Sequence, residues 1–308
     1  MKSTIGFILR IAVAVASLLF IGWKVHDQLA GGIAGIGSLS AVPMLAAVAL
    51  MPLNWLTEAF KWRLLTAHLQ MLNIWQSVKS VLAGLAVSML TPNRVGDFAG
   101  RIALLKPENR TAGAMSAFVG GYAQMLAIAV LGVAAFGFRP ALPDFLSVAA
   151  GHYALTMSVL LVFVAVLSGF YFAAKLMAAR FRFSRWAWLE RFIGAAGLHS
   201  NNQLATAFGL SVCRSLIFML QLWLMLAAAG VHLEAAEAFC SIALMYCFVS
   251  VVPTFALVEW GVRGSMALLF IAGQPTQIVT ATTVLWIVNV AVPAAVGAFV
   301  GVLKTRRI

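Results

Sequence analysis

Residues 78–105 read VKSVLAGLAVSMLTPNRVGDFAGRIALL, an apolar region that the stretch TPNRVGD interrupts at residues 91–97. The arms on either side are roughly 9 to 15 residues long, shorter than the ~20 residues that a helix needs to cross a bilayer. Residues 238–273 follow the same plan, with VPT at 252–254 and EWGVR at 259–263. Short apolar arms around a polar break are typical of re-entrant hairpins, which enter a membrane and return to the same side.

The rest of the chain is too apolar for a soluble protein. Hydrophobic residues make up 63% of its 308 residues and charged residues 10%, with a mean hydropathy of +0.98. Soluble domains average about 25% charged residues. This composition excludes a soluble enzyme and a disordered chain. Unbroken apolar runs long enough to span a bilayer occur at residues 5–23, 39–57, 112–138, 147–174, 204–230 and 276–303.

We therefore predict an all-α polytopic membrane protein with about six full spans and two opposed re-entrant helical hairpins. Residues 1–308 form one membrane-embedded domain, because no length remains for a soluble one. The run at residues 5–23 is predicted to be a retained span rather than a signal peptide, since no small-residue cleavage site precedes the polar residues 24–27.

The basic residues predict the orientation of the chain. If each hairpin returns to its own side, most of the 21 lysines and arginines fall on one face, which the positive-inside rule assigns to the cytoplasm together with both termini. Treating residues 78–91 as a full span would move Lys106 and Arg110 outside and fits less well. The residues counted on the basic face are Lys2, Lys61, Arg63, Lys79, Arg94, Arg101, Lys106, Arg110, Lys175, Arg180, Arg182, Arg185, Arg191, Lys304, Arg306 and Arg307.

Residues 175–203 alternate arginine with phenylalanine and tryptophan before the fifth span. This pattern predicts an amphipathic segment at the cytoplasmic interface. It either anchors the topology or gathers anionic lipid.

The tips of the two hairpins resemble each other. Asp97 precedes Arg101 by four residues, Glu259 precedes Arg263 by four, and a proline (Pro92 or Pro253) precedes each pair. Residues four apart share a helix face, so both pairs are expected to form ion pairs. An inverted pair of broken helices is the usual build of a transporter site. Chance similarity between two Pro–Gly turns is the alternative.

Arg214 stands far from either end of its apolar run, where a charge is expensive. We expect it to have a polar or carboxylate partner, with Asp97 or Glu259 as the first choices, and Gln221 to share its helix face. It either binds substrate or locks the helices together as an ion pair. Arg94, beside backbone amides freed by the break, could complete an anion cradle or could lie in the headgroup region.

Other polar side chains are predicted to face the interior of the bundle. Asn54, Glu58 and Trp62 recur at helical spacing beside Lys61 and Arg63, and Gln124 lies on a span that contains two adjacent glycines. Interhelical hydrogen bonding is an adequate explanation for each of them.

The sequence lacks the motifs that identify several classes of enzyme and metal site. It contains no phosphate-binding loop, no Gly-x-Ser-x-Gly elbow and no metal-ligand spacing among its histidines and three cysteines, so we expect no cofactor and no metal. The net charge of +12 is spread between apolar runs rather than gathered in a basic domain, which argues against a nucleic-acid partner.

The order of these motifs resembles the lysylphosphatidylglycerol synthase transmembrane-domain family, which includes the flippase half of the bacterial multiple peptide resistance factor. The resemblance covers about residues 39–303 and departs at residues 121–124, GYAQ, where many relatives carry an acidic–arginine pair. The residues that carry it are Asn54, Trp55, Glu58, Lys61, Trp62, Arg63, Thr91, Pro92, Gly96, Asp97, Arg101, Pro253, Glu259, Gly261, Val262 and Arg263.

This resemblance implies lipid handling in a bacterial cytoplasmic membrane. The sequence ends at Ile308 without a soluble aminoacyl-transfer domain, so we expect translocation of an anionic phospholipid or lipid-linked substrate between leaflets. A membrane-embedded lipid or glycosyl transferase that uses Asp97 or Glu259 as a base, and a non-transporting partner subunit, are the alternatives. The residues expected to bind substrate are Arg94, Asp97, Arg101, Gln124, Arg214, Gln221, Glu259 and Arg263, with Asn54, Glu58, Trp62 and Arg63 in a secondary role.

Overall fold

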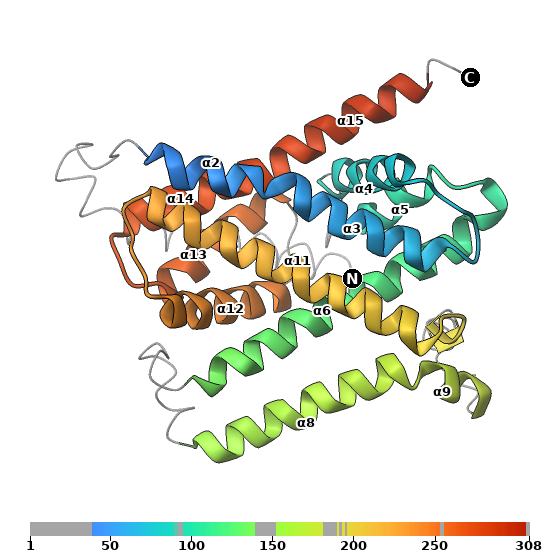
Figure 1. The fold of residues 1–308 in the computed structure, drawn as a ribbon, viewed down its shortest axis with the longest axis horizontal. Coiled ribbons are helices and arrows are strands. Elements are labelled where there is room, and N and C mark those ends of the chain that lie inside the picture. Colours follow the sequence, from blue (N-terminus) through green and yellow to red (C-terminus); the bar gives the residue numbers. More distant parts are fainter. Residues whose placement is uncertain are drawn as a thin grey trace, which may run out of the picture.

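The computed structural model describes residues 39–89, 91, 95–138, 152–180, 190, 193–194, 196–252 and 256–305. Every regular element in these ranges is a helix (Figure 1). Five helices are long and apolar enough to cross a membrane, and they match five of the six predicted spans. The predicted span at residues 5–23 lies outside the described residues. The five are Ala41–Thr66, Pro107–Gly137, Tyr153–Phe172, Asn201–Ala228 and Pro275–Phe299.

Two stacked helices, α2 (Ala41–Ala49) and α3 (Met51–Thr66), form the first described span. They meet at Leu50, next to a proline in the first turn of α3, where a missing amide proton costs nothing. The helix α4 (Ile74–Ser88) then starts with a reciprocal capping box between Asn73 and Gln76.

The helices α4 and α5 (Gly96–Ile102) form a hairpin. The start of α4 and the end of α5 lie at the same end of this hairpin. The amide of Lys106, after α5, donates to the side chain of Gln70 at 3.1 Å, and Asn109 donates to the carbonyl of Leu69 at 3.1 Å. Both residues lie beside the turn that leads into α4. The hairpin therefore begins and ends at the same end of the molecule, which we call the Leu69 end.

The next helices run along the length of the molecule (Figure 1). The chain passes through the short 3₁₀ helix η2 (Pro107–Asn109), α6 (Arg110–Gly137), α8 (Tyr153–Phe172), α9 (Ala174–Arg180) and α11 (Asn201–Ala228). The ring of His199 bonds the carbonyl of Leu65 at 3.0 Å, which places the start of α11 at the Leu69 end. Its last residue, Ala228, accepts from the amide of Ser40 at 2.8 Å, at the start of α2.

The second hairpin, α12 (Ala235–Val251) and α13 (Ala256–Phe270), belongs to this other end. Gly230 ends α11 in the left-handed region, with φ of +85°, and turns the chain toward α12. Gly273, after α13, packs against Val231. The hairpin thus starts and finishes at what we call the Gly230 end, opposite the first hairpin (Figure 1).

The last span is interrupted by one π-helical turn. It consists of α14 (Pro275–Trp286), the π-helix η5 (Ile287–Ala291) and α15 (Val292–Thr305). Such wide turns are frequent at functional positions. The helix α15 packs directly on α4, where Gly297 lies against the carbonyl of Leu82.

The predicted interfacial segment is described only in part. The helix α9 covers its first residues, and residues 181–189 lie outside the described ranges. Pro92, Arg94 and Pro253 are also outside them, so the predicted approach of the two proline tips stays a prediction.

Candidate functional site

Glu58, on the buried face of α3, is the centre of a charge network built by three helices. Its carboxylate lies 2.8 Å from Lys61 Nζ, 2.6 Å from Arg101 Nη1 of α5 and 2.9 Å from Arg214 Nη1 of α11. Arg101 also bonds Asp97 on its own helix at 2.7 Å. The Glu58 side chain is only 4% exposed, so these three cations replace its lost hydration.

Neutral polar groups complete the surroundings of Arg214. Its Nε donates to Asn54 Oδ1 at 2.8 Å, and its Nη1 lies 3.5 Å from Gln124 Oε1. The amide of Gln124 donates to Ser215 Oγ at 2.7 Å, while Lys61 donates to Ser211 Oγ at 3.0 Å. Two serines four residues apart thus place a row of hydroxyl groups along α11.

A second, separate ion pair lies on α13. Arg263 Nη2 is 2.6 Å from Glu259 Oε1, as the four-residue spacing predicts. The guanidinium carbon of Arg263 lies 5.5 Å from the centre of the Tyr246 ring of α12. Arginine over an aromatic face is held by the ring's negative charge distribution. The Glu259 side chain, at 6% exposed, is covered on its other sides.

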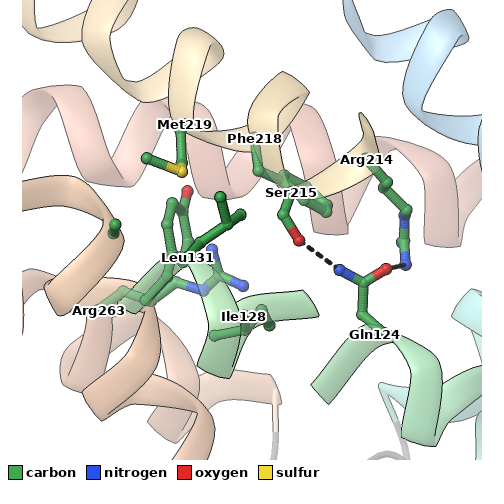
Figure 2. A pocket seen from close by; sticks show the side chains of 10 residues that line it. Gln124, Ile128, Leu131, Arg214, Ser215, Phe218, Met219 and Arg263 are labelled. Atoms are coloured by element: carbon green, nitrogen blue, oxygen red, sulfur yellow. Dashed lines mark hydrogen bonds between the residues drawn. The ribbon is translucent and has the colours of Figure 1, made fainter. Parts of the chain in front are cut away.

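A cavity of about 160 Å³ separates the two charged groups. Arg214 and Arg263 lie on opposite sides of it, with Gln124, Ile128 and Leu131 of α6 between them (Figure 2). The remaining described lining residues are Ser215, Phe218, Met219, Ala243 and Tyr246. Neither Glu58 nor Glu259 is among its lining residues, so the described lining presents cations, hydroxyls and an amide but no acid.

A family model described as lysylphosphatidylglycerol synthase TM region matches residues 7–297, which include every one of these side chains. The chain belongs to this family. Comparison with curated proteins gives no match. Membership agrees with the apolar helices and supports a membrane protein of a lipid-related family.

In this member of the lysylphosphatidylglycerol synthase TM-region family, most predicted site residues are brought together. Asn54, Glu58, Asp97, Arg101 and Arg214 belong to one network. Gln124 bridges that network to the cavity, and Arg263 faces the cavity from the other side. Trp62 is buried next to Arg101, whose guanidinium carbon lies 5.9 Å from the ring centre.

Two of the predicted residues lie elsewhere. Gln221 forms a reciprocal amide pair with Asn289 of the π-helical turn, at 2.9 and 3.2 Å, and also donates to the carbonyl of Ala47. Arg63 is exposed on the far face of α3, where it lines a groove of about 450 Å³ with Phe60, Leu64, Met71 and Leu210.

The structure corrects two expectations about charge. Lys61 and Arg101 were counted on the basic cytoplasmic face, yet both are buried against Glu58 and act as its counter-charges. The carboxylate that the structure gives Arg214 is Glu58, rather than Asp97 or Glu259. Glu58 was placed in a secondary role because helical spacing alone shows neighbours on one helix and not those on another.

Sequence reasoning missed Ser211, Ser215, Tyr246 and Asn289. Asn289 is a polar residue inside an apolar run, which is a usable signal. The two serines lie three residues before and one after Arg214, and a tyrosine within a hairpin arm is a similar hint. Serine and tyrosine are too common in membrane helices for these hints to single them out.

Proposed function

We propose that the protein moves an anionic or lipid-linked group between the leaflets of a bacterial cytoplasmic membrane. In this proposal residues 1–308 are one membrane-embedded domain of six full spans and two re-entrant hairpins, with both termini in the cytoplasm. The Leu69 end faces the cytoplasm because the predicted basic surface lies there.

One observation carries the proposal, which is the cavity between Arg214 and Arg263. Arg214 belongs to the network that holds the hairpin of the Leu69 end, through Glu58 and Arg101. Arg263 belongs to the hairpin of the Gly230 end. A phosphate between them can exchange one guanidinium partner for the other, because arginine binds phosphate oxygens through a planar fork. Such an exchange would take the anion from one half of the molecule to the other.

The arrangement gives less support to the two alternatives. A transferase would need Asp97 or Glu259 as a base, and both carboxylates are held by arginines at 2.7 and 2.6 Å. A subunit whose polar groups only pack helices would have no need of a cavity lined by two cations. Both alternatives remain open to the experiment below, since neither predicts lipid movement by the purified protein.

The test is leaflet translocation of a fluorescent anionic phospholipid by the purified protein in liposomes. Arg263→Lys keeps the charge but loses the planar fork, so one charge-assisted hydrogen bond worth about 1.5–3 kcal/mol is removed. We expect translocation to slow about 10- to 100-fold at equal protein density. Arg110→Lys, at the exposed start of α6, is the matched control and should behave as wild type.

Equal rates for wild type and Arg263→Lys would show that Arg263 only balances Glu259. No lipid movement by wild type, with correct folding, would reject the proposed function.

A further inference from the structure

The charges of the Glu58 network and of the α13 pair do not cancel. Glu58 and Lys61 form a pair within α3, Asp97 and Arg101 within α5, and Glu259 and Arg263 within α13. Arg214 is the one remaining cation among these buried groups, and no acidic residue occurs anywhere in α11. The other charged side chains whose exposure the structure describes are exposed, apart from the partly buried Glu237 in the first turn of α12. The Glu58 network together with the α13 pair therefore carries one positive charge in excess.

Two neutral groups of the Glu58 network, one beside Arg214 and one beside Arg101, also lack acceptors. Among the described residues, buried side-chain nitrogens without a hydrogen-bond partner include Asn54 Nδ2 and Trp62 Nε1. Both are donors. The one acceptor that satisfies no hydrogen-bond geometry, Glu58 Oε2, nevertheless has Lys61 at 2.8 Å and Arg214 at 2.9 Å. Buried donors are normally paired, so this region lacks acceptor atoms.

Neither Asn54 nor Trp62 lines the cavity, and the size of the cavity separately limits what it can bind. At about 160 Å³ it is close to the ~150 Å³ of a protein cavity that holds one benzene molecule. It can hold a phosphate group and the first atoms beyond it, but not a whole lipid. Its lining includes Ile128 and Met219, and its two aromatic rings, Phe218 and Tyr246, already lie against Arg214 and Arg263.

We infer that the cavity binds a phosphodiester of single negative charge, the phosphate of a lipid whose remaining headgroup is uncharged. This inference rests on the proposed function and names its substrate class. One negative charge neutralises Arg214 when the phosphate draws it from Glu58, which keeps Lys61 and Arg101 as partners. A headgroup amine would need a carboxylate in the cavity wall, and the described wall has none. Zwitterionic and cationic headgroups are therefore disfavoured.

The experiment compares two short-chain lipids that differ in headgroup charge. Dihexanoyl-phosphatidylglycerol (one net negative charge) and dihexanoyl-phosphatidylcholine (no net charge) are titrated against the detergent-solubilised full chain, and stabilisation against thermal unfolding is recorded. Wild type should be half-saturated at an about tenfold lower concentration of the glycerol lipid, the size of effect expected for one nearby unit charge in a protein interior. The same two headgroups, on fluorescent long-chain lipids, are then compared for translocation in phosphatidylcholine liposomes.

A charge variant gives a second, independent comparison. Gln124→Glu places one negative charge in the cavity wall beside Arg214 and should remove the preference for the glycerol lipid. Gln203→Glu is the matched control, because it makes the same change in the capping box of α11, where glutamate caps as well as glutamine. It should keep the preference.

The outcomes separate this inference from the proposed function. Equal half-saturation of wild type by both lipids overturns the inference. Equal translocation of both headgroups also overturns it, while lipid movement as such is upheld. A clear preference in binding without translocation of either lipid supports the charge selectivity and rejects transport.

Discussion

Glu58 has three charged partners among the described residues. These three cations come from three helices. If the negative charge of Glu58 were removed, each cation would face the other two without a compensating carboxylate. Removing one partner of a buried ion pair costs far more than the pair contributes, because the remaining charges lose their compensation. This asymmetry makes Glu58 the most sensitive position in the network.

Replacing Glu58 by glutamine should therefore lower the free energy of unfolding by about 3–5 kcal/mol. Asp97→Asn is the control, since the Asp97 side chain is 21% exposed and Arg101 keeps Glu58 as a partner. Its cost should be about 1 kcal/mol or less. Thermal unfolding of both variants in detergent checks the difference, and equal midpoints would show that Glu58 does not organise the network.

At the scale of residues, the sequence alone predicted two ion pairs of the site. The pairs of Asp97 with Arg101 and of Glu259 with Arg263 follow from four-residue spacing on one helix. The contact of Arg214 with Glu58 could not be predicted in this way, because it depends on how α11 packs against α3. Hydrophobic periodicity does not specify which faces of two apolar helices meet.

At the scale of elements, glycines determine how closely the first hairpin packs. Gly100 of α5 lies against the carbonyl of Ala83 in α4, and Gly297 of α15 lies against that of Leu82. Gly84 faces Asp97, so the close approach of α4 and α5 also positions one acid of the charge network. Small residues allow this approach in a membrane, where helices gain little from hydrophobic burial.

A methyl group at either contact should force the helices apart. Gly100→Ala and Gly297→Ala each place a Cβ in overlap with a backbone oxygen, which cannot move as a flexible side chain can. We expect each to cost about 1–3 kcal/mol of unfolding free energy. Gly209→Ala, with no atom within 4 Å of the new Cβ, should be neutral or stabilising by up to about 1 kcal/mol.

The unfolding midpoints of the three variants in the same detergent measure this contrast. If all three shift alike, packing between α4, α5 and α15 is looser than these contacts indicate.

The elements themselves were largely predictable, since five predicted spans correspond to helices of spanning length. The first and last residues of these helices were less predictable. The second predicted span, residues 39–57, continues to Thr66 because polar residues such as Glu58 and Lys61 are paired inside the bundle and do not end the helix. Asn289 marks a polar position in this run, but nothing in the sequence predicts that the turn around it is π-helical.

At the scale of the whole molecule, the two hairpins begin at opposite ends of the bundle. The turns at the Leu69 and Gly230 ends are therefore expected on opposite sides of the membrane. Met71 and His232 are both exposed, at the Leu69 and Gly230 ends respectively. Single cysteines at these positions, in a chain whose native cysteines are replaced by alanine, should react with an impermeant maleimide from opposite sides of the membrane. Met71→Cys should react from the cytoplasmic side, as the positive-inside rule predicts. Labelling of both from one side would reject opposed hairpins.

The difference between charges paired within one helix and a charge paired between helices also bears on how the chain is made. Three acids have a cation three or four residues away on the same helix, so each of them leaves the translocon together with its partner. Arg214 is different, because its counter-charge Glu58 lies on a helix synthesised long before α11. We therefore expect α11 to leave the translocon more readily when α3 is beside it, because Glu58 then lowers the cost of placing Arg214 in the membrane. In Glu58→Gln, newly made α11 should remain crosslinkable to the translocon for longer than in wild type, and unchanged crosslinking would show that α11 enters the lipid unaided.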